Sequence, residues 1–525
     1  MCRVYMFAAI VISPRARAAQ NAAISRSGHA GRTETVLIGP SDEEASIMAS
    51  EDEELTPLRY KKAEDFNEWY NEVVERAGLC DKRYPVKGLN IWTPYGWAAM
   101  RAIDSKMRAE MEATGHSEVC FPLLVPEDQF KKEADHIKGF SDEVYWVTRA
   151  GGNDLDVKLL LRPTSETAIY PIFSLWVRSH ADLPLKIFQI VNAFRFDTKQ
   201  TRAFIRMREF HFFEAHTCHA DFEGAEEQIG EDLQVMARLA KGLCLSYLVL
   251  KRPEWDKFPG AFYSLGCDAL LPDGRTCQIG TIHQYRDNFA KAYDIKYEDA
   301  SGEHKAVHQT TYGMSERLLG AIVGMHGDDS GVLLPPEIAP VQVVVVPILA
   351  KEMKGPVLDE ATKICEELKR AGLRVTVDAR DIRPGAKYYH WEMRGVPLRV
   401  EIGPRDMKEG KVVLVRRDNR QKSFVPRVAM AGEVRRTLDV IAMEMSARST
   451  ELLKKGIRDI SSLEQEPANG ILRAGWCGQQ SCGHEMEDRL GVKMLGTPYE
   501  KQAPTGKCAA CGKDATETAY LARTY

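Results

Sequence analysis

The chain lacks long apolar runs, a strong excess of either charge and a dense set of cysteines. No stretch of its 525 residues approaches the roughly 20 consecutive apolar residues of a membrane helix, so we expect no membrane association. The formal net charge is −4, so local patches, and not an overall basic field, would have to attract any polyanion. Most of the 12 cysteines are scattered, which is typical of reduced thiols in a cytoplasmic protein and argues against a disulfide framework.

The first 53 residues differ in composition from the rest. Residues 1–33 hold five arginines and no acidic residue, whereas residues 42–54 hold seven acids. The basic part resembles a weak organellar presequence, and the alternative is a disordered tail or an upstream extension. We favour the tail or extension, with a functional start nearer Met48, and we expect globular structure to begin near Leu55.

Hydrophobic patterning beyond Leu55 predicts three further domains. Amphipathic helices at 65–77 and 96–114 and a buried strand at 117–126 open an α+β domain at 54–335. Pro122 inside that strand indicates a sheet edge or a subunit boundary. Alternating strands and helices then predict a compact α/β unit at 340–446, and a helical linker leads into a small cysteine-bearing domain at 447–525.

Basic and aromatic side chains gather between Phe194 and Thr217. The pattern predicts two antiparallel strands, 190–196 and 205–213, joined by a polar loop. Because side chains alternate across a strand, one face would carry Arg206, Arg208, Phe210, Phe212, Glu214 and His216. Arginine forks hold phosphate oxygens and an aromatic ring stacks on a base, so a nucleotide could bind here beside Arg195. A solvated edge strand over an aromatic core explains the pattern equally well.

Three further segments place polar groups at the ends of predicted elements. In LRPTSET, Thr164 and Glu166 could hold a substrate ammonium, or could simply begin a helix. In QIGTIH, Gln278, Thr281 and His283 share a strand, although a lone histidine is more often structural. In GMSERLLG, Arg317 lies early in a predicted helix, where a cation opposes the helix dipole. An anionic ligand at the start of the helix would explain this position.

The C-terminal cysteines give a stronger chemical signal. Cys477 and Cys482 form one close pair and Cys508 and Cys511 another. Four thiolates in two pairs are typical of a closed, tetrahedral structural zinc site, which leaves no position open for catalysis. Redox thiols and chance clustering are the alternatives.

Together these segments carry a resemblance. From Leu55 to Tyr525 the chain closely resembles the prolyl-tRNA synthetases of archaeal and eukaryotic type, a family of class II aminoacyl-tRNA synthetases. The motifs that carry it are DFNEWY, TGHSEVCFPLLVP, LRPTSET, FRFD with FIRMREF, GMSERLLG, HWEMRGVPLRVEIGPRDM and the four cysteines. The resemblance implies a six-stranded antiparallel catalytic sheet with helices, an α/β anticodon-binding domain and a zinc-binding C-terminal domain.

The resemblance also implies an activity and its site residues. Proline and ATP would give prolyl-adenylate and pyrophosphate, and the prolyl group would pass to the 3′ end of tRNA(Pro), with Mg²⁺ assisting. Arg195 and Arg317 would be catalytic, and the ATP site would comprise Arg195, Arg206, Phe210, Gln278, Thr281 and Arg317. The proline site would comprise Thr164, Glu166, Arg195, Phe212, Glu214, His216, Phe258, Thr281 and His283. Carboxylate attack on phosphorus needs alignment and charge neutralisation, so we assign no general base.

Other expectations follow from the same resemblance. Glu392, Arg399 and Arg405 would contact anticodon bases, although a surface salt-bridge network is the alternative. The protein would be a homodimer, and the carboxylate of Tyr525 would turn toward the active site. The segment between Arg195 and Arg317 is too short for an inserted editing domain. Two departures, Asp197 for the usual glutamate and TIHQYRDNF for TSHxLGQNF, put fine substrate selectivity in doubt.

Two groups of rival functions remain at this stage. A sibling synthetase for serine, threonine or histidine would share the catalytic fold, but LRPTSET argues against serine and threonine. A synthetase-like binding protein without catalysis, or a zinc-ribbon nucleic-acid module, would also explain parts of the sequence. The joint presence of Arg195, Arg206 and Arg317 argues for retained catalysis.

Overall fold

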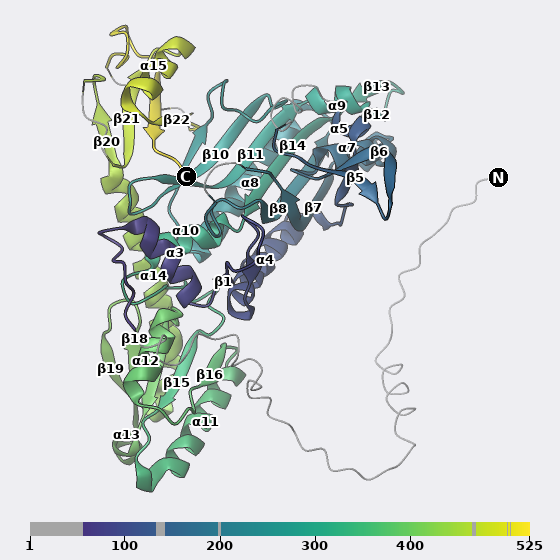
Figure 1. Ribbon diagram of the computed structural model, residues 1–525. Helices are drawn as coiled ribbons and strands as arrows, with labels where there is room; N and C mark the ends of the chain where they lie inside the picture. The colour runs from purple at the N-terminus through teal and green to yellow at the C-terminus, as the bar shows by residue number, and fades with distance from the viewer. Residues whose placement is uncertain (1–55, 133–141, 198–200, 465–468, 501, 505) are drawn as a thin grey trace, which may run out of the picture. The chain divides into compact units, whose positions relative to one another are not determined.

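The computed structural model describes residues 56–525, apart from 133–141, 198–200, 465–468, 501 and 505 (Figure 1). The predicted tail or leader at 1–53 lies outside the described residues. Residues 55–525 form one compact unit. Within the described part, no helix combines the length and the apolar character that a membrane crossing requires.

The largest sheet has eleven strands, and its centre is the predicted antiparallel catalytic sheet. Six strands are antiparallel neighbours in the order β7, β8, β14, β11, β10 and β9. Their bounds are Leu185–Phe194, Glu209–His219, His308–Ser315, Thr276–Arg286, Tyr263–Leu270 and Leu248–Lys251. The short strand β3 (Ser117–Glu118) adds to one edge in parallel. The expected α+β class is confirmed.

Helices pack on this sheet, and polar residues cap several of them. Asp65 accepts a hydrogen bond from the Glu68 amide at the start of one helix, and Thr93 caps the next from the Gly96 amide. Asp221 caps the long helix that packs on β11 and β14. The helices of this domain are α3 (Phe66–Arg76), α4 (Pro94–Ala113), α5 (Glu127–Phe130), α7 (Glu166–Trp176), α8 (Phe222–Gly242), α9 (Asn288–Tyr293) and α10 (Arg317–His326).

The expectation of one buried strand at Ser117–Pro126 is wrong. The segment forms two short strands in different sheets, β3 and β4 (Leu124–Pro126). Pro122 cannot donate a ladder hydrogen bond and lies between them. Most side chains here are exposed, and only Phe121 and Val125 are buried. Strand β4 pairs with β6 (Asn153–Leu161), and β6 pairs in turn with β5 (Tyr145–Ala150).

The predicted hairpin exists, but its strands lie further from the loop than expected. Strand β7 ends at Phe194 and β8 begins at Glu209, and these two residues are paired. Arg195, Arg206 and Arg208 therefore lie in the connection and not on the strands. Alternation along β8 governs side-chain direction only from Glu209 onward.

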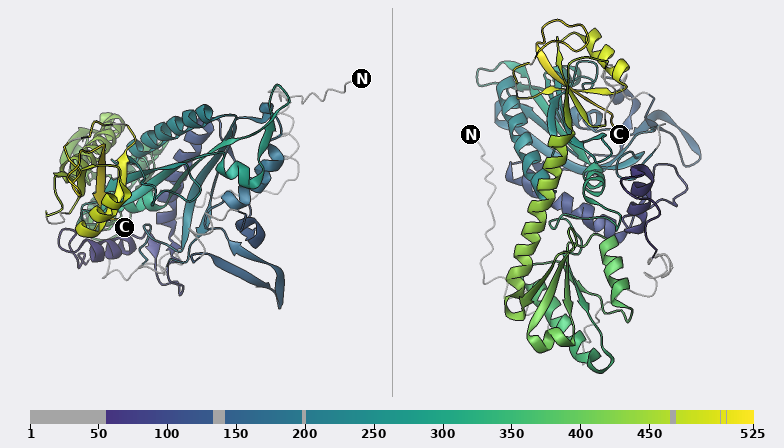
Figure 2. Two further views of the ribbon diagram at one scale, coloured as in Figure 1. Left: turned by 90° about the horizontal axis from the view of Figure 1, so that it is seen from above. Right: turned by 90° about the vertical axis from the view of Figure 1, so that its left-hand side faces the viewer.

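The predicted α/β unit has a five-stranded mixed sheet. Strands β16 (Val375–Val377), β15 (Val343–Pro347) and β17 (Leu398–Ile402) are parallel, and β18 (Lys411–Arg416) and β19 (Lys422–Pro426) continue the sheet antiparallel. Its helices are α11 (Lys354–Arg370), α12 (Pro384–Met393), α13 (Pro404–Glu409) and α14 (Met430–Gly456). Figure 2 shows α14 as one long helix, so the expected boundary at 446 falls inside a continuous element.

The C-terminal strands extend the catalytic sheet. Strand β22 (Lys493–Pro498) pairs with β9, and β23 (Glu517–Ala522), β21 (Ile471–Trp476) and β20 (Ile457–Ile460) follow in that order. Helix α15 (Gln480–Leu490) packs on these strands, and together they bury a small hydrophobic core separate from that of the catalytic sheet. The remaining short strands are β1 (Cys80–Asp81), β2 (Ile91–Trp92), β12 (Lys296–Glu298) and β13 (His304–Ala306), and the 3₁₀ turns are η2 (His180–Asp182), η3 (Lys351–Met353) and η4 (Arg427–Ala429).

Candidate active site

A cavity of about 460 Å³ opens on the catalytic sheet and gathers most of the predicted site residues. Its walls come from the start of α7, the β7–β8 connection, strands β8, β11 and β14, the β9–β10 connection and the start of α10. The predicted residues that line it are Thr164, Glu166, Arg195, Arg206, Phe210, Phe212, Phe258, Gln278, Thr281, His283 and Arg317. Segments distant in sequence thus converge on one hollow.

Three arginines in the cavity wall are each held by an oxygen of the protein. The Arg195 Nε donates to the Pro163 carbonyl at 3.1 Å, and the Arg317 Nε donates to the Ile205 carbonyl at 2.7 Å. Arg206 forms an ion pair of 2.5 Å with Asp197. Burial lowers the pKa of Arg195 below its ordinary value despite the nearby carboxylate of Glu143, and the charge of Arg317 lowers it further. An anionic ligand would relieve that electrostatic cost.

Aromatic rings form the part of the wall next to these cations. The Arg195 guanidinium lies 5.2 Å from the ring centre of Phe210. Phe210 and Phe212 are two residues apart on β8 and meet edge to face, with ring centres 5.5 Å apart. A flat apolar face beside fixed positive charges suits a nucleotide, whose base stacks while its phosphates meet the guanidinium groups.

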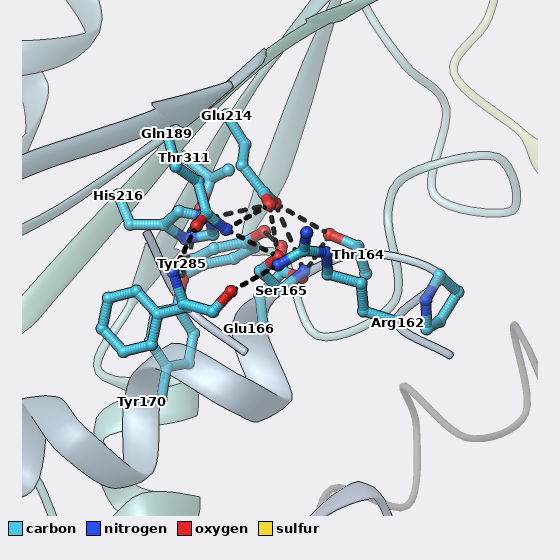
Figure 3. Close-up of polar contacts among 12 residues, drawn as sticks. Arg162, Thr164, Ser165, Glu166, Tyr170, Gln189, Glu214, His216, Tyr285 and Thr311 are labelled. Carbon is cyan, nitrogen blue, oxygen red and sulfur yellow. Dashed lines mark hydrogen bonds and ion pairs between the residues drawn. The ribbon is translucent and has the colours of Figure 1, made fainter. Parts of the chain in front are cut away.

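A corner of buried oxygens lies where α7 begins (Figure 3). Thr164 donates to one Glu166 carboxylate oxygen at 2.5 Å, and Tyr285 donates to the other at 3.0 Å. Ser165 occupies the N-cap position, but its hydroxyl bonds Glu214 and does not cap the helix. The alternative explanation of LRPTSET as a simple helix start therefore holds for Glu166, which lies in the first turn of α7, but no side chain caps the helix. A buried carboxylate at a cavity wall is suited to an ammonium or imino group.

Glu214 and His216 do not line the cavity, contrary to expectation. Both are fully buried, because residues further along β8 pass under the α7 corner. Glu214 accepts hydrogen bonds from the Ser165 amide at 3.2 Å and from the Gln189 amide group at 2.9 Å, and it lies 3.2 Å from His216 Nε2. Burial by itself raises the pKa of Glu214, but the hydrogen bond and charge of His216, with the hydrogen bonds from the Ser165 hydroxyl and from Gln189, leave the pKa below its ordinary value. The pair therefore supports the Thr164–Glu166 corner from behind.

His283 is held on both ring nitrogens inside the cavity wall. Its Nδ1 lies 2.8 Å from the Ser264 hydroxyl and its Nε2 lies 3.1 Å from the Thr281 hydroxyl. The Phe258 ring lies 4.5 Å from the imidazole ring. Burial lowers the pKa of His283 to about 3, so the ring is neutral at physiological pH. A neutral histidine beside a phenylalanine forms a mostly apolar wall.

Arg208 does not join the phosphate-facing group. Its guanidinium lies 4.1 Å from the ring centre of Phe196, and its Nε donates to the Asp197 carbonyl. The prediction that Arg208 shares a face with Arg206 fails because both precede β8, where strand alternation does not apply.

Sequence reasoning missed several supporting residues. Ser165, Gln189 and Tyr285 complete the oxygen corner, and Ser264 orients His283. Gln189 had a usable signal, since an amide in the middle of an apolar strand needs a buried partner. Ser264 had none, because its contact depends on the pairing of β10 with β11.

Comparisons with known proteins show which family the chain belongs to. Residues 145–326 match the family model of the class II tRNA synthetase core domain (G, H, P, S and T). Residues 342–437 match the model of an anticodon-binding domain, and residues 463–525 match that of the C-terminal domain of prolyl-tRNA synthetase. The chain is 57% identical to the proline–tRNA ligase of Thermococcus kodakarensis over 477 residues, 89% of this chain and 99% of that one. The chain belongs to the prolyl-tRNA synthetase family.

Further relatives agree with this family. The proline–tRNA ligase of Methanosarcina mazei is 48% identical over 481 residues, 91% of this chain and all of the other. The solved structure of Giardia lamblia prolyl-tRNA synthetase in complex with prolyl-adenylate superposes with a TM-score of 0.85 at 35% identity, over 88% of this chain and 98% of that one. These matches span all the described domains.

The four C-terminal cysteines of this synthetase chain come together in space. Their sulfur atoms all lie within 4.8 Å of one another. That spacing fits a single tetrahedral ion held by four thiolates. Cys477 follows β21, Cys482 lies in α15, and Cys508 and Cys511 lie in the turn before β23, so the metal would tie three elements together.

The three predicted anticodon residues of the synthetase differ in their surroundings. Arg399 on β17 is buried and forms ion pairs with Glu392 at 3.0 Å and Glu401 at 2.9 Å. Arg405 on α13 is exposed and pairs with Glu409 one turn later. The structure thus shows the salt-bridge network that the sequence left as an alternative, and the RNA-binding role stays a prediction.

The last residue of the synthetase lies against the catalytic domain. The Tyr525 hydroxyl donates to Asp273 at 2.5 Å, and its ring lies 5.0 Å from the guanidinium of Arg202. Arg202 belongs to the same connection as Arg206. The C-terminus therefore reaches the loop that carries a cavity arginine.

Proposed function

We propose that the chain is a proline–tRNA ligase that makes prolyl-adenylate from L-proline and ATP and then charges tRNA(Pro). One observation carries the proposal: three fixed arginines and an aromatic face share a cavity with the buried Thr164–Glu166 corner. The arrangement supplies a site for a triphosphate, a base and an imino group side by side. Relatives called proline–tRNA ligase, which match nearly the whole chain, support it.

The first step needs alignment and no side-chain nucleophile. A proline carboxylate oxygen forms a bond to the α-phosphorus, the bond from that phosphorus to the β-phosphate bridge breaks, and pyrophosphate leaves. Arg195 would hold the α-phosphate and the proline carboxylate, while Arg206 and Arg317 would hold the far phosphates. Phe210 would stack on adenine, and Gln278 would reach the nucleotide. Thr164 and Glu166 would accept the prolyl imino group.

The rest of the proline pocket sets the choice of amino acid. Phe212, Phe258, Thr281 and His283 would surround the ring of proline, and Glu214 and His216 would fix the corner from behind. In the second step a terminal ribose hydroxyl of the tRNA attacks the prolyl carbonyl carbon and AMP leaves. Mg²⁺, when bound, would neutralise phosphate charge. The carboxylates of Glu143 and Asp197 in the cavity wall offer the oxygen ligands that it prefers.

We also propose the finer features of this enzyme. Residues 54–335 would form the catalytic domain, 340–446 the anticodon-binding domain with Glu392, Arg399 and Arg405 at the anticodon, and 447–525 the zinc-binding domain. Zn²⁺ would bind Cys477, Cys482, Cys508 and Cys511. The protein would act as a homodimer in the cytoplasm. Exposed apolar residues around β4, including Leu123 and Leu124, support a subunit contact.

ATP–pyrophosphate exchange with each standard amino acid tests the proposed function. We expect exchange that depends on proline, with other amino acids far weaker, and charging of tRNA(Pro) but not of other tRNAs. Stronger exchange with threonine, serine or histidine would point to a sibling synthetase, and no exchange with any amino acid would point to a binding protein.

A further inference from the structure

The connection between β9 and β10, residues 252–262, contacts two domains. Five of its residues line the cavity: Arg252, Asp256, Lys257, Phe258 and Pro259. Trp255, in the middle of this run, packs instead with the small core of the C-terminal domain. We call residues 252–262 the pocket loop. A loop that lines the proline pocket is therefore anchored outside the catalytic domain.

The indole of Trp255 packs closely against His484, Trp476 and Gly483, and we call these three residues the seat of Trp255. Its ring centre lies 4.6 Å from that of His484 and 6.1 Å from that of Trp476. Gly483 completes the seat, because a Cβ atom there would come within 2.4 Å of Trp255 Cη2. The indole fills the space that a side chain at position 483 would need.

The seat is built next to the cysteine cluster. Trp476 immediately precedes Cys477, and Gly483 immediately follows Cys482. The backbone of both walls is therefore fixed by whatever holds the two cysteines in place. How firmly the four cysteines are held in place therefore affects the position of Trp255.

Both ends of the pocket loop are fixed as well. At its start, Arg252 donates to the Leu495 carbonyl of β22 at 2.5 Å and pairs with the buried carboxylate of Asp268. Near its end, the Phe258 amide donates to the Ser264 hydroxyl at 2.9 Å, and that hydroxyl also bonds His283. A shift of Trp255 would therefore move the Phe258–His283 wall of the cavity.

We infer that Trp255 is a positioning residue through which the C-terminal domain sets the shape of the proline pocket. The inference rests on the proposed function, because it takes the Phe258–His283 wall as the wall that meets proline. The arginines of the nucleotide side stand on other elements, the β7–β8 connection and α10. Loosening of the pocket loop should therefore weaken proline binding more than ATP binding.

Three variants test the inference in the full-length, metal-loaded protein. Trp255→Ala empties the seat, Gly483→Ala pushes the indole out of it, and Trp255→Phe keeps a ring against His484. Trp255 Nε1 has no hydrogen-bond partner among the described residues, so phenylalanine loses no polar contact. Alanine favours helix more than glycine does, so Gly483→Ala should not weaken α15 itself. Gly230→Ala, in α8 with no atom within 4 Å of the added carbon, is the matched control.

Steady-state pyrophosphate exchange gives the decisive comparison. We expect the KM for proline to rise about tenfold in Trp255→Ala and Gly483→Ala, with the KM for ATP and the zinc content near those of the parent. The Tm should fall by a few degrees in both, because one change leaves a cavity and the other overpacks the site. Trp255→Phe should recover most of the proline affinity. An unchanged proline KM in Gly483→Ala, or an equal rise for proline and ATP, would overturn the inference. Absence of proline-dependent exchange in the unsubstituted chain would instead overturn the proposed function and the inference with it.

Discussion

At the residue scale, the carboxyl group of Glu316 is buried where α10 begins. It lines the main cavity and a second hollow of about 90 Å³. Its Oε2 has no hydrogen-bond partner within the described part of the chain. Burial raises its pKa to about 8. The group therefore carries its proton at neutral pH, next to an arginine that would meet phosphate.

This shift predicts a stability that falls as pH rises. The unfolded chain releases the Glu316 proton near the ordinary glutamate pKa of about 4.3, whereas the folded protein keeps it until about pH 8. Between these values the unfolded state binds fewer protons, so the free energy of unfolding decreases with pH, and above pH 8 the dependence ends. Glu316→Gln should therefore lose less Tm than the parent does between about pH 5.5 and about pH 8.5.

The control for Glu316 removes the same charge from the surface. Glu298→Gln, at an exposed position of β12, should keep the parent's pH dependence. Thermal unfolding of the three proteins across the pH range gives the comparison. If Glu316→Gln and the parent lose the same Tm, the carboxyl group is not protonated in the folded state.

Arg195 gives a second prediction at the residue scale, for catalysis. Lysine keeps the charge, but it lacks the planar fork of Arg195, in which Nε donates to the Pro163 carbonyl while the other two nitrogens can face ligand oxygens. We expect Arg195→Lys to lower kcat/KM for pyrophosphate exchange about 100-fold, with little change in Tm. Arg208→Lys, in the same connection but stacked on Phe196 outside the cavity, should stay within a few-fold of the parent. Equal losses in the two variants would contradict the assignment of Arg195.

At the element scale, periodicity predicted most helices and strands but not their ends. The amphipathic patterns predicted the first two helices at 65–77 and 96–114, within two residues of the observed Phe66–Arg76 and Pro94–Ala113. The connection that bears Arg206 was mistaken for strand, because alternating aromatic and basic residues also suit a loop folded against a cavity. Ser117–Pro126 looked buried because its composition is apolar, and composition does not tell a core from an exposed face.

The candidate site was predictable only where a motif carried it. Thr164, Arg195 and Arg317 lie in segments that the resemblance names, and they line the cavity. The depth of Glu214 was not predictable, because it depends on α7 passing over β8. The seat of Trp255 was not predictable either, because it is formed by residues more than 200 positions away.

The packing of α10 against the arginine connection gives the prediction at this scale. A Cβ atom at Gly320 would lie 2.8 Å from the Phe204 carbonyl oxygen, next to the Ile205 carbonyl that holds Arg317. Gly320→Ala should displace both arginine-bearing segments, lower the Tm by a few degrees and reduce pyrophosphate exchange about tenfold or more. Gly230→Ala meets open space and should instead stabilise the protein by about 0.5–1 kcal/mol. A Gly320→Ala enzyme with the parent's Tm and rate would show that this contact is not rigid.

At the scale of the whole molecule, the C-terminal domain and the catalytic domain share one sheet. Thr497 and Pro498 of β22 pair with Lys251 and Leu250 of β9. Leu250 and Leu270 also share a buried cluster with Leu495 and Tyr520. The cysteine cluster stands at the outer part of this sheet. Loss of the proposed zinc should therefore be felt in the catalytic domain, although a site of four thiolates would have no open coordination position for chemistry.

Removal of the metal tests this continuity. We expect about one zinc ion per chain, released by a chromogenic chelator only after the thiols are modified. Cys482→Ser with Cys508→Ser should abolish the zinc, lower the Tm and raise the KM for proline, because the walls around Trp255 lose their support. Cys120→Ser, which removes an exposed thiol outside the cluster, should keep the zinc, the Tm and the KM. A zinc-free double variant with the parent's Tm and proline KM would show that the shared sheet holds the C-terminal domain in place without the metal.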